Sequence, residues 1–177
     1  VFVDGEIKMS KNEGEVKIQG VKGNIQIEDQ KGRVEIEQQQ GKVGIQGLEG
    51  DLVVKNFSGD SNISQVHGAI RVVSRLGNVQ VLKSSGGVDF DLGKGALSVS
   101  AFQGSLRGKT DDGGVSAQIE SEPDVQIETI HGNVSIKLKS TAGVGLKLQT
   151  EEGTMWSPAP LNKPVHLGIK KVITGKL

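Results

Sequence analysis

Glycine recurs every nine residues through most of this chain of 177 residues. The glycines stand at positions 5, 14, 23, 32, 41, 50, 59, 68, 77, 86, 95, 104 and 113. After a one-residue insertion Pro123 takes the glycine position, and Gly132 resumes the spacing. Most of the glycines open a G-x-Φ-x-Φ pattern, where Φ is apolar, as in Gly23–Ile27 and Gly77–Val81. Such alternation indicates a short strand with one buried face, and the glycine permits a tight corner before it.

These strands are too short, and their connections too poor in Asn-Gly turns, to pair as hairpins. A nine-residue unit buries its two apolar residues when copies of it stack above and below. We therefore predict an all-β, single-domain parallel β-solenoid, also called a parallel β-helix. Because parallel crossovers strongly prefer the right hand, we expect a right-handed coil.

The position seven residues after each glycine is our test of the coil length. At a period of 27 residues one class of these positions is mostly apolar, comprising Val21, Leu48, Arg75, Phe102 and Ile130. Small polar residues directly after the glycine follow the same period, and we interpret them as a ladder bonded to corner backbone: Asn24, Asp51, Asn78, Ser105 and Asn133. At a period of 18 residues, the positions of the first test do not separate into apolar and polar classes. The sequence thus predicts a three-sided coil of 27 residues, with about six coils in all.

The repeat fades near the end of the chain. We assign residues 1–155 to the solenoid repeats and residues 156–177 to a C-terminal capping segment of the same domain, because an open solenoid end would recruit other chains. Trp156, the only tryptophan, is expected to cover the open core there. A tryptophan that stacks on a ligand is the alternative. Because the chain begins at Val1, we also expect that an upstream segment was removed.

Composition excludes several classes of function. Lys plus Arg and Asp plus Glu number 21 each, so no overall field attracts nucleic acid. No apolar run reaches the roughly 18 residues of a membrane span. The absence of cysteine excludes a disulfide scaffold, thiol chemistry and cysteine-based zinc sites.

Solenoids of similar repeat length bind calcium or ice, but this chain lacks their signatures. Calcium rolls need regular double glycines and an aspartate column, whereas only Gly86-Gly87 and Gly113-Gly114 double here. The six threonines form no recognisable rank on a strand face. His67, His131 and His166 do not fall together in the 27-residue frame, so we expect no metal site and no cofactor.

Clustered carboxylates would be required for a carbohydrate-active enzyme of the β-helix class. We expect Asp89 and Asp91 to project from one strand, with Glu35, Glu37 and Asp60 on the same side in lower coils. Enzymes of this class also carry long loop insertions that wall a cleft, and this chain has almost none. A solvated acidic face is the simpler interpretation, so we assign no catalytic residues.

Outward apolar residues are the more informative anomaly. In the 27-residue frame, Val53 and Leu82 face outward on one side in adjacent coils, and Val73 faces outward on the adjoining side. A cluster of exposed apolar residues on a polar prism can mark an interaction patch. The alternative is that the tail or an additional segment folds over them.

The stretch from His131 to Met155, HGNVSIKLKSTAGVGLKLQTEEGTM, resembles the closing segment of a bacterial family of adhesin-like β-strand-repeat domains. The likeness lies in the G-[DN]-V-x-[VI] strands, the small-residue loop after them and the closing glycine segment. The resemblance implies a β-solenoid that is often exported or membrane-anchored, with no established catalytic residues.

The sequence therefore predicts a noncatalytic structural or adhesin-like interaction module of the bacterial cell envelope, located in the periplasm or at the cell surface. Its partner would be a protein or a glycan, and self-association is a further option. Two alternatives stay open, a scaffold that stacks head to tail as bactofilins do and a carbohydrate-active β-helix enzyme.

Overall fold

The computed structural model describes residues 2–120, 124–139, 145–157, 165–167 and 170–176, which form strands joined by tight corners and no helix. The strands of the first half are β1 (Phe2–Glu13), β2 (Val16–Lys31), β3 (Val34–Gln40), β4 (Val43–Glu49), β5 (Leu52–Ser58), β6 (Ser61–His67), β7 (Ile70–Leu76) and β8 (Val79–Leu82). Those of the second half are β9 (Ser85–Lys94), β10 (Leu97–Asp112), β11 (Val115–Ile119), β12 (Asp124–His131), β13 (Val134–Leu138), β14 (Gly145–Glu152), β15 (Met155–Trp156), β16 (Val165–Leu167) and β17 (Lys170–Lys176).

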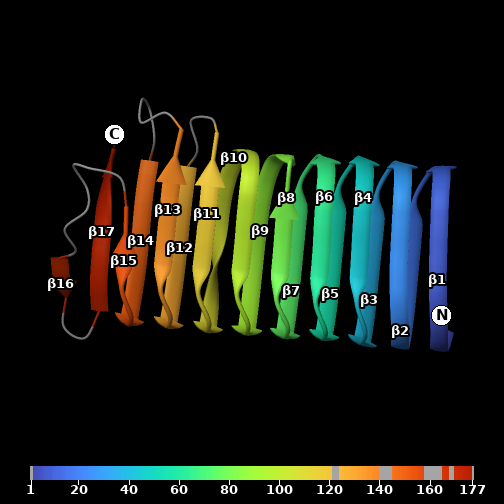
Figure 1. The fold of residues 1–177 in the computed structure, drawn as a ribbon, viewed down its shortest axis with the longest axis horizontal. Helices are drawn as coiled ribbons and strands as arrows, with labels where there is room; N and C mark the ends of the chain where they lie inside the picture. The colour runs from blue at the N-terminus through green and yellow to red at the C-terminus, as the bar shows by residue number, and fades with distance from the viewer. Residues whose placement is uncertain (1, 121–123, 140–144, 158–164, 168–169, 177) are drawn as a thin grey trace.

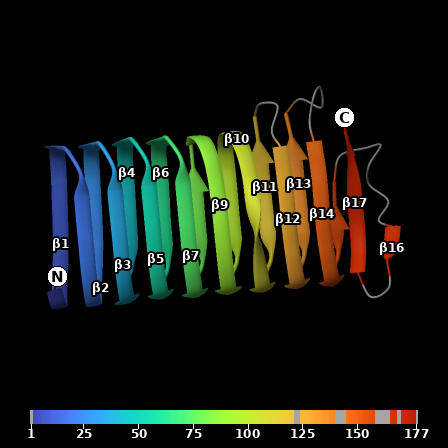
Figure 2. The same cartoon turned by 180° about the vertical axis from the view of Figure 1, so that it is seen from behind.

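The strands stack as a parallel β-solenoid of about eight turns, which confirms the predicted fold class. Figures 1 and 2 show the coils side by side along the long axis, from β1 at one end to β17 near the other. The pairings of most coils join residues 18 apart, as in Val43↔Ser61 and Leu52↔Ile70. One coil is therefore two nonapeptides with two flat faces, and the prediction of a three-sided coil of 27 residues is wrong. The handedness of the coil stays a prediction.

The two faces turn their side chains inward differently, and this misled the sequence test. On the face containing β4, β6 and β8, the sixth residue after the corner glycine has a positive φ, between 50° and 71°, at Lys11, Asp29, Gly47, Gln65, Lys83 and Ala101. This kink turns the seventh residue into the core, so Leu48 and Phe102 are fully buried. The face containing β3, β5 and β7 has no such kink. There the sixth residue points inward and the seventh outward, which leaves Val21 and Ile130 exposed by 42% and 37%.

Glycine recurs because the corners of successive coils lie too close for a side chain. A Cβ on Gly41 would lie 1.7 Å from the carbonyl oxygen of Gly23, one coil away. The same residue has a φ of +134°, which other residues rarely adopt. The nine-residue spacing thus records two corners per coil, each lined by a column of stacked glycines.

Four of the five residues in the predicted ladder of small polar side chains, all but Ser105, bond corner backbone. Asn24 Oδ1 accepts from the backbone N–H of Lys42 at 3.1 Å, and Asp51 Oδ1 accepts from that of Ala69 at 2.9 Å. Asn78 and Asn133 make the same contact one coil further on, with Ala96 and Thr154. Each bond joins residues 18 or 21 apart, which is one coil. Because the coil has two corners, these residues belong to two separate columns, one at each corner.

The C-terminal strands change direction where the parallel stack ends. β17 pairs antiparallel with β14, opposite Leu148, and places Ile173 on the core at 2% exposure. Trp156 is 50% exposed, so the prediction that it covers the open core is wrong. Met155 packs against the core, and the next residue of a strand must point to the other side. The predicted boundary between residues 155 and 156 falls inside β15. The division of the domain into solenoid repeats and a capping segment stays a prediction.

Candidate functional site

One face of the solenoid carries alternating charges, and we call it the charged face. Its outward side chains come from β2, β3, β5, β7, β9 and β10, at the third and fifth positions after the corner glycine. The register aligns them in two columns, Lys17, Glu35, Val53, Arg71, Asp89, Arg107 and Gln19, Glu37, Lys55, Val73, Asp91, Lys109. Opposite charges stand next to each other in both columns, so this face is largely neutralised from within.

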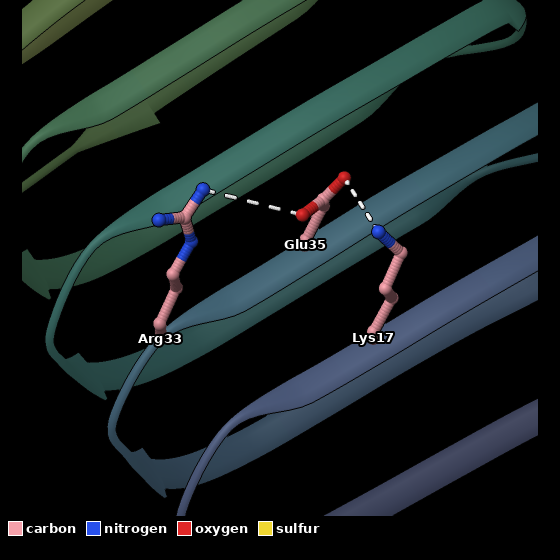
Figure 3. Close-up of polar contacts among 3 residues, drawn as sticks. All are labelled: Lys17, Arg33 and Glu35. Carbon is pink, nitrogen blue, oxygen red and sulfur yellow. Dashed lines mark hydrogen bonds and ion pairs between the residues drawn. The ribbon is translucent and has the colours of Figure 1, made fainter.

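Ion pairs on the charged face join neighbouring coils, except for the pair of Arg33 and Glu35, which lies within one coil. Figure 3 shows Glu35 between two cations, with Oε1 at 3.3 Å from Lys17 Nζ and Oε2 at 4.0 Å from the Arg33 guanidinium. Asp91 lies in the same way between Arg75 at 3.9 Å and Lys109 at 3.8 Å. Exposed pairs each contribute little to stability. Their effect here is that each of these two carboxylates has cations beside it.

On the opposite face, the outward positions three and five residues after the corner glycine carry no charge over five consecutive coils, and we call these ten positions the neutral face. Glu49 and Lys83 are exposed charged residues of the same coils that lie nearer the next corner. The residues of the neutral face come from β4, β6, β8, β10 and β11 and are Gly44, Gln46, Asn62, Ser64, Gln80, Leu82, Ser98, Ser100, Ser116 and Gln118. Glu28 precedes this set, and Lys137 follows it. With strands about 4.8 Å apart, the neutral face is about 19 Å long. It offers rows of amide and hydroxyl groups on a flat support.

The predicted patch of Val53, Val73 and Leu82 is divided between the two faces. Val53 and Val73 lie on adjacent strands of the charged face, diagonally across the β5–β7 pairing. Leu82 lies on the neutral face, where it pairs in register with Ser64. All three side chains are half-buried. The 27-residue frame placed Val53 and Leu82 together because it assigned strands of opposite faces to one side.

A groove lies at the edge of the charged face, around Phe57. It holds about 380 Å³, and we call it the Phe57 groove, lined by Gln19, Gly20, Val21, Glu37, Gln38, Gln39, Lys55, Asn56, Phe57, Val73 and Arg75. Phe57 is 58% exposed. Of the predicted patch, only Val73 lines this groove.

The floor of the Phe57 groove borders a buried column of polar side chains. Asn56 donates from Nδ2 to the carbonyl oxygens of Gly41 at 2.9 Å and Gly59 at 3.1 Å. Gln38 Nε2 donates to Asn56 Oδ1 at 3.5 Å. Gln38 is 3% exposed, and its Oε1 has no hydrogen-bond partner among the described residues. The groove therefore has an exposed aromatic ring at its surface, and behind its floor lies a column of buried polar side chains that point into the core.

The 27-residue frame could not identify the Phe57 groove, because it does not distinguish inward from outward positions at the end of a strand. No signal in the sequence revealed it, because Gln38, Asn56 and Ser74 are polar and yet buried. Their inward direction, and hence the outward direction of Phe57, follows only from the 18-residue register.

Of the carboxylates considered for catalysis, Glu35 and Glu37 do lie on the same face as Asp89 and Asp91, as expected, but Asp60 does not. Asp60 lies at a corner, where Oδ1 accepts from the backbone N–H of Asn78 at 2.9 Å. Glu35 and Asp89 share a column but stand three coils apart, which is roughly 14 Å. A pair of catalytic carboxylates in glycosidases is roughly 5–10 Å apart. Asp89 and Asp91 do project from one strand, as expected, with Asp91 between two cations.

The histidines lie at different corners, as the sequence suggested. His67 Nδ1 is 2.8 Å from Ser85 Oγ, and His131 Nε2 is 3.7 Å from a Glu152 carboxylate oxygen. His166 lies among residues whose side chains are outside the described part. Within the described residues, no three His, Cys, Asp or Glu side chains are grouped closely enough to hold a metal ion.

Comparison with models of protein families, with curated proteins and with solved structures finds no match to this chain. None of the described segments is a helix of the length and hydrophobicity that crossing a membrane requires. Inference about function therefore rests on the charged face, the neutral face and the Phe57 groove.

Proposed function

We propose that this chain is a noncatalytic, adhesin-like interaction module of the bacterial cell envelope, and that the neutral face makes the contact. The observation that carries the proposal is the unequal division of charge between the two faces. Ten outward positions in five coils of the neutral face hold no charge. The corresponding positions of the charged face alternate in sign.

The contrast matters because charged groups cost far more to remove from water than amides or hydroxyls. Surfaces of soluble domains carry about 25–35% charged residues of both signs, and the centres of interfaces are depleted of them. A charge-free area on a chain that is 24% charged is therefore suited to contact. Gln, Asn and Ser supply both donors and acceptors there, which fits a polar, uncharged partner such as a glycan or a neutral protein surface.

Three further points support a binding role in the envelope rather than catalysis. Asp91, the carboxylate best placed for acid–base work beside Asp89, lies between Arg75 and Lys109. The likeness of residues 131–155 to adhesin-like repeats supports an extracytoplasmic location. A continuous ladder of backbone hydrogen bonds between coils makes the solenoid a rigid support for the contact.

Charge placed on the neutral face tests the proposal. The variant Asn62→Lys with Ser98→Lys adds two positive charges at exposed positions of that face. The control Glu15→Gln with Asp112→Asn changes net charge by the same amount at exposed residues elsewhere. Each protein is pelleted with purified peptidoglycan sacculi, with a neutral insoluble glucan and with an isolated envelope fraction.

We expect the unmodified protein and the control to pellet with at least one of these fractions, and the lysine variant to lose at least tenfold in apparent affinity. Equal pelleting of all three proteins, or pelleting of none, would overturn the proposal. Sedimentation velocity over a hundredfold concentration range addresses the scaffold alternative. Open-ended growth of the unmodified protein would favour head-to-tail assembly instead.

A further inference from the structure

We propose that the Phe57 groove is a binding site for a neutral sugar, with one pyranose ring stacked on Phe57. The groove belongs to the charged face and shares no residue with the neutral face. The inference therefore does not depend on the function proposed above.

The apolar part of the groove matches the face of a sugar ring. Phe57 is 58% exposed, the highest value among the exposed large hydrophobic residues of the described chain. Val21 and Val73 line the same groove. In the 18-residue register, Gln39 precedes Phe57 in its column and Arg75 follows it. The ring thus lies between an amide and a guanidinium, with its apolar surface open to solvent.

The polar part of the groove supplies partners for hydroxyl groups. Gln19 and Gln39 line it with exposed amides, and Lys55 and Arg75 line it with donors. The side chains of Gln38 and Asn56, by contrast, point into the core and pair with each other there. A hydroxyl group both donates and accepts, so it can pair with an amide or a cation at the rim.

Charge in the groove favours a neutral ligand over an anion or a cation. Arg75 has Asp91 at 3.9 Å, and Lys55 stands in register with Glu37 on the adjacent strand. Each cation thus has an acidic neighbour. The volume of about 380 Å³ falls within the range of small-ligand sites and suits one or two sugar rings. An apolar peptide would fill the groove but leave more of its polar rim unpaired.

The test uses the full chain, labelled with ¹⁵N, titrated with cellobiose, maltose and N,N′-diacetylchitobiose as three neutral disaccharides. We expect at least one of them to give saturable shifts of amide resonances in β3, β5 and β7. Phe57→Ala should weaken that binding at least tenfold, and Phe57→Trp should retain it, since both aromatic rings can stack. Ile130→Ala is the matched control, because Ile130 is an exposed apolar residue at the equivalent position of β12 on the same face.

A second variant examines the polar rim. Gln39→Ala removes an exposed amide that lines the groove and should weaken binding about threefold, because a sugar hydroxyl loses a partner there. Circular dichroism identifies any variant that fails to fold, and Phe57→Trp keeps the test decisive if one does. The proposal is wrong if no disaccharide shifts these amides, or if Phe57→Ala and Ile130→Ala bind equally. Loss of binding in the neutral-face lysine variant would also contradict it, since that variant leaves the groove intact.

Discussion

The glycine column can be tested with a pair of substitutions that separates backbone conformation from steric contact. Gly14 and Gly32 have nearly the same φ, +106° and +108°. A Cβ on Gly14 meets nothing within 4 Å, whereas a Cβ on Gly32 would lie 2.5 Å from the carbonyl oxygen of Gly14. Gly14→Ala therefore carries the cost of the backbone conformation, and Gly32→Ala carries that cost together with a clash.

The difference between the two variants follows from the contacts at that corner. An alanine at position 32 must push the Gly14 carbonyl away by roughly 1 Å to reach an ordinary contact. That carbonyl accepts from Gln30 Nε2 at 2.8 Å, and the Gly14 N–H donates to Lys31 O at 2.8 Å. Strained backbone costs about 1–3 kcal/mol, and each weakened hydrogen bond about 1 kcal/mol. We expect Gly14→Ala to lose about 1–3 kcal/mol and Gly32→Ala about 2 kcal/mol more.

Urea unfolding followed by far-ultraviolet circular dichroism measures both losses. Because a solenoid can fray locally from one end, amide hydrogen exchange in β2–β4 should accompany it. Equal destabilisation of the two variants would refute the reasoning, since it would mean that the backbone conformation alone requires glycine. In that case the close approach of stacked corners would not be what fixes the repeat.

Three further predictions concern side chains between coils. Asn56→Leu should cost about 2–3 kcal/mol of unfolding free energy, because two buried corner carbonyls lose their donor; Ser74→Ala, whose hydroxyl has no partner among the described residues, should change urea stability by less than about 0.5 kcal/mol. Equal losses would contradict this. Glu35→Gln should cost less than about 1 kcal/mol, with the loss vanishing in 1 M salt, because its contact with Lys17 is partly exposed; a salt-independent loss would argue against the ion pair. Ile173→Ala should cost about 2–4 kcal/mol and speed hydrogen exchange in β14, and unchanged exchange there would show that β17 does not protect that strand.

The sequence was sufficient to predict the strands and their stacking, because glycine spacing and apolar alternation are local signals. The coil length depended on knowing which residue turns inward at the end of each strand. Val21, Leu48 and Phe102 suggested one apolar class, although Val21 is exposed and the other two are buried. The backbone kink that separates these cases falls on residues as unlike as Lys11 and Ala101. No residue type marks the kink in the sequence, so hydrophobicity alone could not predict its position.

Polar residues held the missing information. Thr110, Thr129 and Thr150 form a buried column, although the threonines were expected to form no rank. A buried hydroxyl looks like a surface residue in sequence, and its column becomes recognisable once the register is known. The same reason explains why the Phe57 groove was not predicted.

The buried polar column and the glycine corners act together. A tight corner leaves a glycine carbonyl near the core, and a side chain at the end of the strand donates to it. Asn56 does so to Gly41 and Gly59, and Thr150 does so to Gly132. The column is incomplete at Gln38, Ser74 and Thr110, where Oε1, Oγ and Oγ1 lack partners among the described residues. These groups point into the core, so no ligand on the outer surface completes the column. The cost of removing a column side chain therefore depends on whether it donates to a corner carbonyl, which is why Asn56→Leu should destabilise the protein more than Ser74→Ala.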